Sequence, residues 1–152
     1  MSDLHEGPYI SALLCEKVLE EKDGVKSAIR IIDRVTRTMV GPDASPTLQP
    51  FDYSMSLLIR LKSGHVRGVY TIKVNLVKPS GESFQMMQLP VHFEGEEDRG
   101  VDVAGQIQMR IEEPGLYWFE ISLQDRGADE LLTRLPFRVV YLPQITPRVV
   151  GN

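Results

Sequence analysis

The sequence predicts a single all-β domain over residues 1–152, an antiparallel sandwich of about seven or eight strands. Two observations carry this prediction. Apolar residues recur at every second position through most of the chain, which is typical of strands with one buried face. Turn residues interrupt these runs about every ten residues, which is the spacing of a sandwich or a barrel. The composition, 42% hydrophobic and 25% charged, is that of an ordinary globular protein.

The segment Ile10–Glu20 fits two structures. Its apolar residues fall at helical spacing, and its Glu and Lys residues favour a helix. Alternatively, Ile10–Glu20 and Val25–Thr38 are two strands of a hairpin joined across Lys22–Gly24, because Asp-Gly between hydrophobic runs is a strong hairpin signal. β-branched residues favour a strand in the second arm. The pattern alone leaves the first arm undecided.

The rest of the chain alternates more regularly. Gly41–Pro50 contains three prolines, which exclude regular structure there. Pro136 cannot donate a hydrogen bond to a neighbouring strand, so its strand is expected at an edge or with a bulge. Arg126–Glu130 is predicted as a turn, and residues 1–8 and 143–152 as loose or extended tails. Six further strands are predicted at Phe51–Leu61, Tyr70–Leu76, Leu89–Phe93, Val101–Ile111, Tyr117–Leu123 and Leu131–Tyr141.

One local motif makes the fold prediction more specific. Glu113–Tyr117 reads Glu-Pro-Gly-Leu-Tyr, which is similar to the Asp-x-Gly-x-Tyr segment before a late strand of immunoglobulin-like domains. In those domains the tyrosine hydroxyl bonds back to nearby backbone. A plain Pro-Gly turn before an aromatic strand is the alternative. The sandwich is therefore predicted to be immunoglobulin-like or related.

Charge and cysteine content exclude several classes of protein. The formal net charge is −4, whereas a nucleic-acid-binding domain usually has a basic face, and anionic membranes attract basic proteins. Cys15 is the only cysteine, so the chain can form neither an intrachain disulfide nor a cysteine-rich metal site. A reducing cytoplasm fits this usage. Neither a secretory signal nor a run of 18 apolar residues is found.

The sequence holds no recognisable catalytic group, so we expect neither an enzyme nor a cofactor. His5 lies in the predicted tail, His65 in a turn, and His92 on the solvent side of its strand. A catalytic histidine needs a nucleophile and an orienting partner, and no serine-elbow motif is present. Cys15 lies among aliphatic residues and is expected to be a small buried hydrophobe.

The candidate residues for partner binding are Trp118, Arg30, Arg34 and Arg138. Trp118 alternates with polar residues, so it is either an exposed anchor or covered by the Gly41–Pro50 loop or the first hairpin. If Val25–Thr38 is one strand, Arg30 and Arg34 share a face with Lys26, Thr36 and Thr38. Arginine is enriched at interfaces, although an ordinary charged face is the alternative.

An acidic loop provides weak candidates for a calcium site. Its carboxylates are Glu94, Glu96, Glu97, Asp98 and Asp102. Calcium takes six to eight oxygen ligands, but the spacing here is not that of a known calcium loop, and Arg99 lies in the middle. A solvated charged loop is therefore expected.

Several stretches, distributed over nearly the whole chain, together resemble a known family. They are Pro8–Ser11, Leu14–Val25, Ile29–Arg34, Leu61–Gly64, Pro90–Glu96, Gly115–Phe119 and Leu132–Tyr141. In these the chain resembles a bacterial family of small β-sandwich proteins known only as a domain of unknown function. The resemblance implies a hairpin around Asp23-Gly24, and so a strand at Ile10–Glu20. It implies no active site.

The expected function is a non-enzymatic protein-binding module or subunit of a bacterial complex in the cytoplasm. An edge strand and the candidate anchor Trp118 support this expectation. Two alternatives are a small-ligand or calcium-binding sandwich that uses the loop 94–102, and a self-associating structural protein. A hydrolase is a third, which would need carboxylates converging in a cleft.

Overall fold

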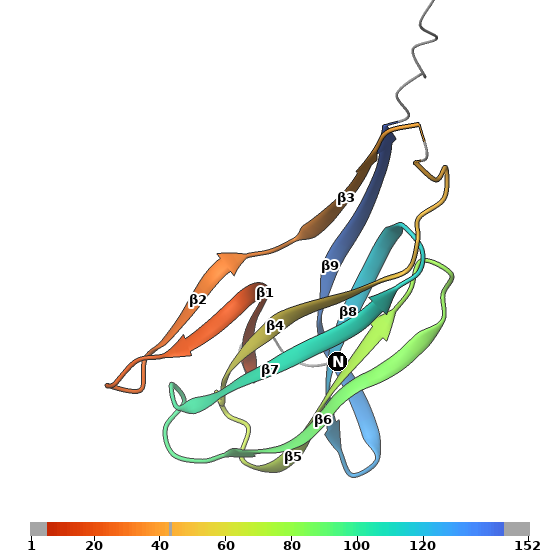
Figure 1. The fold of residues 1–152 in the computed structure, drawn as a ribbon. Coiled ribbons are helices and arrows are strands. Elements are labelled where there is room, and N and C mark those ends of the chain that lie inside the picture. The colour runs from red at the N-terminus through yellow and green to blue at the C-terminus, as the bar shows by residue number, and fades with distance from the viewer. Residues whose placement is uncertain (1–5, 43, 145–152) are drawn as a thin grey trace, which may run out of the picture.

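The computed structural model describes residues 6–42 and 44–144, and in these residues the chain is all-β, without a helix. Nine strands form two sheets that enclose one core (Figure 1). The strands are β1 Tyr9–Glu20, β2 Lys26–Ile31, β3 Arg34–Val40, β4 Phe51–Lys62, β5 Gly68–Val77, β6 Ser83–Phe93, β7 Gly100–Ile111, β8 Gly115–Asp125 and β9 Ala128–Gln144. One sheet has the order β2-β1-β4-β7, and the other β3-β9-β8-β5-β6.

The core lies between the inner faces of the two sheets. Alternate residues of β4, β5, β7, β8 and β9 point into it, as the two-residue periodicity predicts. Phe137 of β9 is fully buried and connects the sheets, because its ring stacks on Tyr53 of β4 at 5.8 Å between centroids. It also meets the ring of Phe119 edge-on, at 6.4 Å.

The segment Ile10–Glu20 lies within strand β1, which settles the alternative left open by the sequence. The first half of β1 pairs with β4 and the second half with β2, so one strand serves two neighbours (Figure 1). The turn at Asp23-Gly24 is the predicted hairpin: Gly24 has φ +85°, and the Asp23 carboxylate accepts a hydrogen bond from the Val25 N–H at 3.1 Å.

The prediction of one strand at Val25–Thr38 is wrong. The chain leaves the first sheet after Ile31 and joins the second at Arg34, so this stretch forms β2 and β3 in different sheets. Arg34 therefore does not share a face with Arg30 and Lys26, which both belong to β2. β3 pairs with β9 in parallel, so the fold is not wholly antiparallel, and the strand count rises to nine. β-branched residues favour a strand at each end of the break, so composition did not reveal it.

Two other strands, β6 and β9, exceed their predicted lengths most. β6 begins at Ser83, six residues before the predicted start. The first half of the strand was not predicted, because a bulge in its pairing with β5, near Val74/Asn75, interrupts the alternation of apolar residues. β9 begins at Ala128, so the predicted turn Arg126–Glu130 shrinks to Arg126-Gly127, and both of these residues have positive φ.

Pro136 lies where the sequence predicts, at a local edge. β3 pairs only with Arg138–Gln144 of β9, so the part of β9 that contains Pro136 has β8 alone as its neighbour. A bulge also lies nearby, between Ile121 and Ser122 in the pairing with β8. The open edge, not the bulge, spares Pro136 a hydrogen bond that it could not donate, because the nitrogen of Pro136 faces the side on which β3 has ended.

The Gly41–Pro50 loop has no regular structure in its described residues, as predicted, but it packs against the core. Ala44 and Leu48 are buried, and the Tyr141 hydroxyl donates to the Ser45 carbonyl. At the termini, the predicted tails fall largely outside the described residues, as does His5. In the described part, the Glu6 carbonyl accepts a hydrogen bond from the His65 N–H at 2.7 Å, and Pro143 belongs to β9.

A search of the described residues for a helix long and apolar enough to cross a membrane finds none.

Candidate functional site

The predicted tyrosine hydrogen bond is present. The Tyr117 hydroxyl, in β8, donates to the Glu113 carbonyl at 2.7 Å, and the side chain is buried. Gly115, with φ +130°, provides the backbone turn between the two residues. Burial raises the pKa of Tyr117 above its ordinary value, and the charge of Glu113 adds to this rise while the backbone hydrogen bond opposes it. The bond therefore anchors the first turn of chain into β8 at Tyr117, the residue before Trp118.

Removing this hydroxyl should cost stability. We expect Tyr117→Phe to lower the free energy of unfolding by about 1 kcal/mol at pH 7, the usual value of one hydrogen bond. Because the folded-state pKa is raised, the neutral phenol stabilises the fold fully below the unfolded pKa of about 10, and this contribution is lost at higher pH. Urea denaturation at pH 7 and pH 10.5 measures both effects. An unchanged urea midpoint at pH 7 would show that the hydrogen bond from Tyr117 to Glu113 does not stabilise the fold.

Trp118 lies on the outer face of the second sheet and is half-buried. Its strand neighbours are Val77 of β5 and Pro136 of β9. The Arg134 guanidinium lies over the indole ring at 4.2 Å from its centroid, and it also pairs with Glu120 at 3.1 Å. This geometry is a cation–π contact supported by an ion pair. Trp118 is thus not fully exposed, and Arg134 covers part of its ring.

The structure brings three of the four predicted binding residues onto one face. Arg34 of β3 lies directly beside Arg138 of β9 in the register, and Arg138 lies beside Leu116 of β8. Buried Phe137 and Val139 point inward, so Arg138 points outward on the same side as Trp118. We call this surface the Trp118 face; its residues are Arg34, Leu116, Trp118, Arg134, Pro136 and Arg138.

The fourth predicted residue, Arg30, lies elsewhere. It belongs to β2 in the other sheet, and its guanidinium pairs with Glu16 at 3.0 Å. Its backbone has φ +55°, a left-handed conformation that is uncommon for a residue other than glycine. Arg30 is therefore not part of the Trp118 face.

Sequence reasoning missed Arg134 as a member of the Trp118 face, and it missed the ion pair between Arg134 and Glu120. Alternation from Pro136 places Arg134 outward, so one half of the signal was available. The partner Glu120 depends on the pairing of β8 with β9, where a bulge shifts the register two residues further along. Periodicity along one strand cannot give that register.

The carboxylates of the acidic loop pair with separate basic side chains and do not lie around a common point. Glu94 pairs with His92 at 3.8 Å, Glu97 with His65 at 2.9 Å, and Asp102 with Arg60 at 2.9 Å. In the part of the chain that the structure describes, no three His, Cys, Asp or Glu residues are placed to share a metal ion. Calcium binding by Glu94, Glu96, Glu97, Asp98 and Asp102 stays a prediction.

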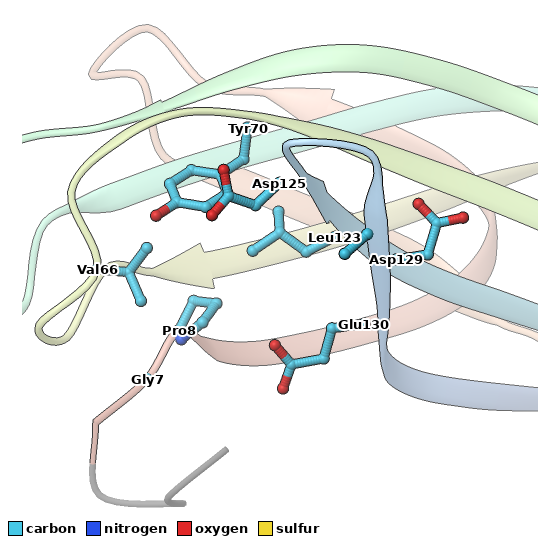
Figure 2. Close-up of a pocket in the computed structure, with 9 residues that line it drawn as sticks. Gly7, Pro8, Val66, Tyr70, Leu123, Asp125, Asp129 and Glu130 are labelled. Atoms are coloured by element: carbon cyan, nitrogen blue, oxygen red, sulfur yellow. The ribbon is translucent and has the colours of Figure 1, made fainter. Parts of the chain in front are cut away.

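A hollow of about 320 Å³ opens at one end of the fold, between Pro8, Val66 and the hairpin that joins β8 to β9 (Figure 2). Asp125, Asp129 and Glu130 line it, together with the ring of Tyr70. Asp129 is held by Lys73 at 3.6 Å. The hollow is on a different part of the molecule from Trp118, and its wall combines apolar side chains with carboxylates.

Cys15 and the two described histidines lie as predicted. Cys15 is fully buried, and burial raises the pKa of its thiol above the ordinary value. A raised pKa makes a thiol a poorer nucleophile at neutral pH. His65 is exposed in the turn after β4, and His92 is exposed on the solvent side of β6.

Two solved structures to which the chain is similar are distant from it in sequence. A β-glucosidase from Listeria innocua matches at 10% identity and a TM-score of 0.36, over 89% of this chain and 17% of that one. A family 123 glycoside hydrolase from Clostridium perfringens matches at 9% identity and a TM-score of 0.35, over 91% of this chain and 28% of that one. The chain thus spans less than a third of either enzyme. No curated protein matches the sequence.

A family model matches most of the chain. It covers residues 10–140, which include eight of the nine strands in full or nearly so and both arms of the first hairpin. The matched range contains Arg34, Trp118 and Arg138. The chain therefore belongs to a family of unknown function, DUF6941.

Proposed function

We propose that this chain is a non-enzymatic protein-binding module of immunoglobulin-like fold, a subunit of a bacterial complex in the cytoplasm, and that it binds its partner through the Trp118 face. The observation that carries the proposal is the position of Trp118, Arg34 and Arg138 on one outer face of the second sheet. These residues come from three adjacent strands, so a rigid sheet holds them in place.

The chemistry of this face suits a protein partner. Tryptophan and arginine are the residue types most enriched among those that dominate binding energy, because a large ring and a planar guanidinium give much contact area per side chain. Trp118 is preordered by Arg134, so little side-chain entropy remains to be lost on binding. Arg138 makes no ion pair with any described residue, which leaves its guanidinium available to a carboxylate.

Two further observations support the finer parts of the proposal. The hydrogen bond from Tyr117 to Glu113 is the contact expected of a tyrosine corner, a feature of immunoglobulin-like domains. The single cysteine is free and buried, which suits a reducing compartment.

Truncating Trp118 should separate binding from folding. We expect Trp118→Ala to weaken partner binding by about 2 kcal/mol or more, while the free energy of unfolding falls by only about 1–2 kcal/mol, because the ring is half-buried on the outer face and loses its contact with Arg134. The tagged protein is used to isolate a stoichiometric partner from its native host, and the affinity of the purified pair is then measured by calorimetry.

A matched control uses the same sheet. Val69→Ala removes a side chain that is 68% exposed on the outer side of β5, and it should change neither affinity nor stability. If Trp118→Ala binds the partner as tightly as the unchanged protein, the Trp118 face is not the binding surface. If the variant unfolds, Trp118 is a structural residue.

A further inference from the structure

Strand β3 lies at the end of its sheet with one side open. In the order β3-β9-β8-β5-β6 its only neighbour is β9, and among the described residues no strand pairs with its other side. Six of its seven residues are exposed, all except Val35. An edge of this kind presents a row of unpaired backbone groups to which an extended chain can bind.

The hydrogen bonds at the two ends of β3 identify which residues face the open side. The Asp33 carbonyl accepts from the Arg138 N–H at 3.1 Å, and the Gly41 N–H donates to the Gln144 carbonyl at 2.9 Å. In a parallel pair, alternate residues of a strand direct their backbone groups to the same neighbour. The residues of odd number therefore face β9. The open side is formed by the N–H and C=O groups of Arg34, Thr36, Thr38 and Val40.

The charge of this edge is local and positive. β3 contains Arg34 and Arg37 and no acidic residue, in a chain whose net charge is −4. The Arg34 side chain is 61% exposed, its nearest carboxylate, Asp33, is 3.9 Å away, and Arg138 lies alongside it. The β3 strand of a second copy contains no acidic side chain that could be placed beside Arg34. An acidic segment is favoured instead.

The other end of the same edge is apolar. Val40 is 67% exposed, and Leu142 of β9, which lies beside Thr38, is 47% exposed. The positions beside Arg34 and Val40 are six residues apart on one face of the strand. Charge at one end and apolar surface at the other define a pattern for the segment that would bind.

We propose that β3 accepts an extended segment of a partner protein as an additional strand, with an acidic side chain beside Arg34 and an apolar one six residues away beside Val40. This inference rests on the proposed function and names the partner's chemistry. The added strand would extend the sheet that carries the Trp118 face, so the edge and the face would bind one partner together.

Short peptides test the edge without the natural partner. The probe is a fluorescein-labelled peptide, Asp-Ser-Thr-Glu-Thr-Ser-Val, with a second peptide in reverse order because the new strand can run in either direction. Control peptides carry Lys in place of Asp and Glu. We expect one acidic peptide to bind the full chain with a dissociation constant of roughly 10–500 μM by fluorescence anisotropy, more weakly at 300 mM than at 50 mM salt.

Two variants and their controls locate the binding. Thr36→Pro removes an N–H on the open side without removing a bond to β9, and should weaken binding at least about 10-fold, whereas Thr36→Ala keeps the N–H and should bind normally. Arg34→Glu should weaken the acidic peptide about five-fold or more and favour the lysine peptide. Arg110→Glu is the control: it reverses the charge of an arginine whose side chain is similarly exposed, 58%, but lies on the other sheet, and it should not change the affinity for either peptide.

The outcomes separate this inference from the proposed function. If neither acidic peptide binds at 1 mM, or if Thr36→Pro binds as well as Thr36→Ala, the edge inference is wrong, although loss of the natural partner in Trp118→Ala would still support the proposed function. If sedimentation shows a dimer that Thr36→Pro abolishes, the occupant is a second copy and the acidic partner is wrong. If Thr36→Pro unfolds, the Arg34→Glu variant provides the test. If that variant binds the acidic peptide and the lysine peptide with the same preference as the unchanged protein, the inference is wrong.

Discussion

Replacing Gly100 by alanine is expected to destabilise the fold by about 2–4 kcal/mol, more than a methyl group added to any other glycine in the described part of the chain. A Cβ at this position would lie 1.6 Å from the Leu61 carbonyl oxygen, 2.6 Å from the Leu61 carbonyl carbon and 2.9 Å from the Lys62 Cα. All three are backbone atoms of β4, so no side-chain rotation can relieve the overlap. The pairing of β4 with β7 must open at this end.

The consequence extends into the loop that follows. Gly100 pairs with Lys62, and immediately beyond it the Ser63 N–H donates to the Arg99 carbonyl at 2.8 Å. Separating the strands breaks this bond and exposes Ser63, which is fully buried and donates to the Glu96 carbonyl at 3.0 Å. Buried polar groups that lose their partners add to the cost.

Gly105 provides the control on the same strand. A Cβ there would also overlap a neighbour, at 1.9 Å, but that neighbour is the terminal methyl group of Met87, which can rotate away. Urea denaturation of Gly100→Ala and Gly105→Ala measures the difference. If the two substitutions lower the free energy of unfolding equally, the close approach of the β4 and β7 backbones is not the reason that position 100 requires glycine.

Truncating Phe137 should cost about 3–5 kcal/mol, the usual range for a buried phenylalanine reduced to alanine. The ring is fully buried and packs between Tyr53 of the first sheet and Phe119 of the second. Its removal leaves a cavity at the contact between the sheets, where neither backbone can collapse without losing its own strand pairs. In a chain of 152 residues this corresponds to a fall in melting temperature of roughly 6–20 °C.

Phe84→Ala is the matched control for this prediction. Phe84 lies on β6, is 41% exposed, and contacts Lys78 through its ring face at 4.8 Å. Its truncation should cost about 1 kcal/mol, because much of the ring is already in water. Thermal melting followed by circular dichroism compares the two. If both substitutions lower the melting temperature by a similar amount, Phe137 does not form the main contact between the sheets.

The amino-acid sequence by itself determined the class of the fold and much of its local structure. Alternation at two-residue spacing identified the inner faces of β4, β7 and β8, because a strand projects side chains to opposite sides in turn. Asp23-Gly24 identified the first hairpin, and Glu113–Tyr117 identified a hydrogen bond between residues four apart. All these features depend on neighbours along the chain.

Tertiary structure decided what depends on residues far apart in sequence. The change of sheet between Ile31 and Arg34 could not be predicted from composition, because β-branched residues lie on both sides of it. Arg34 and Arg138 are brought side by side only by the parallel pairing of β3 with β9. The register between distant strands is set by the packing of the whole core, whereas a local pattern specifies only which side of its own strand each residue occupies.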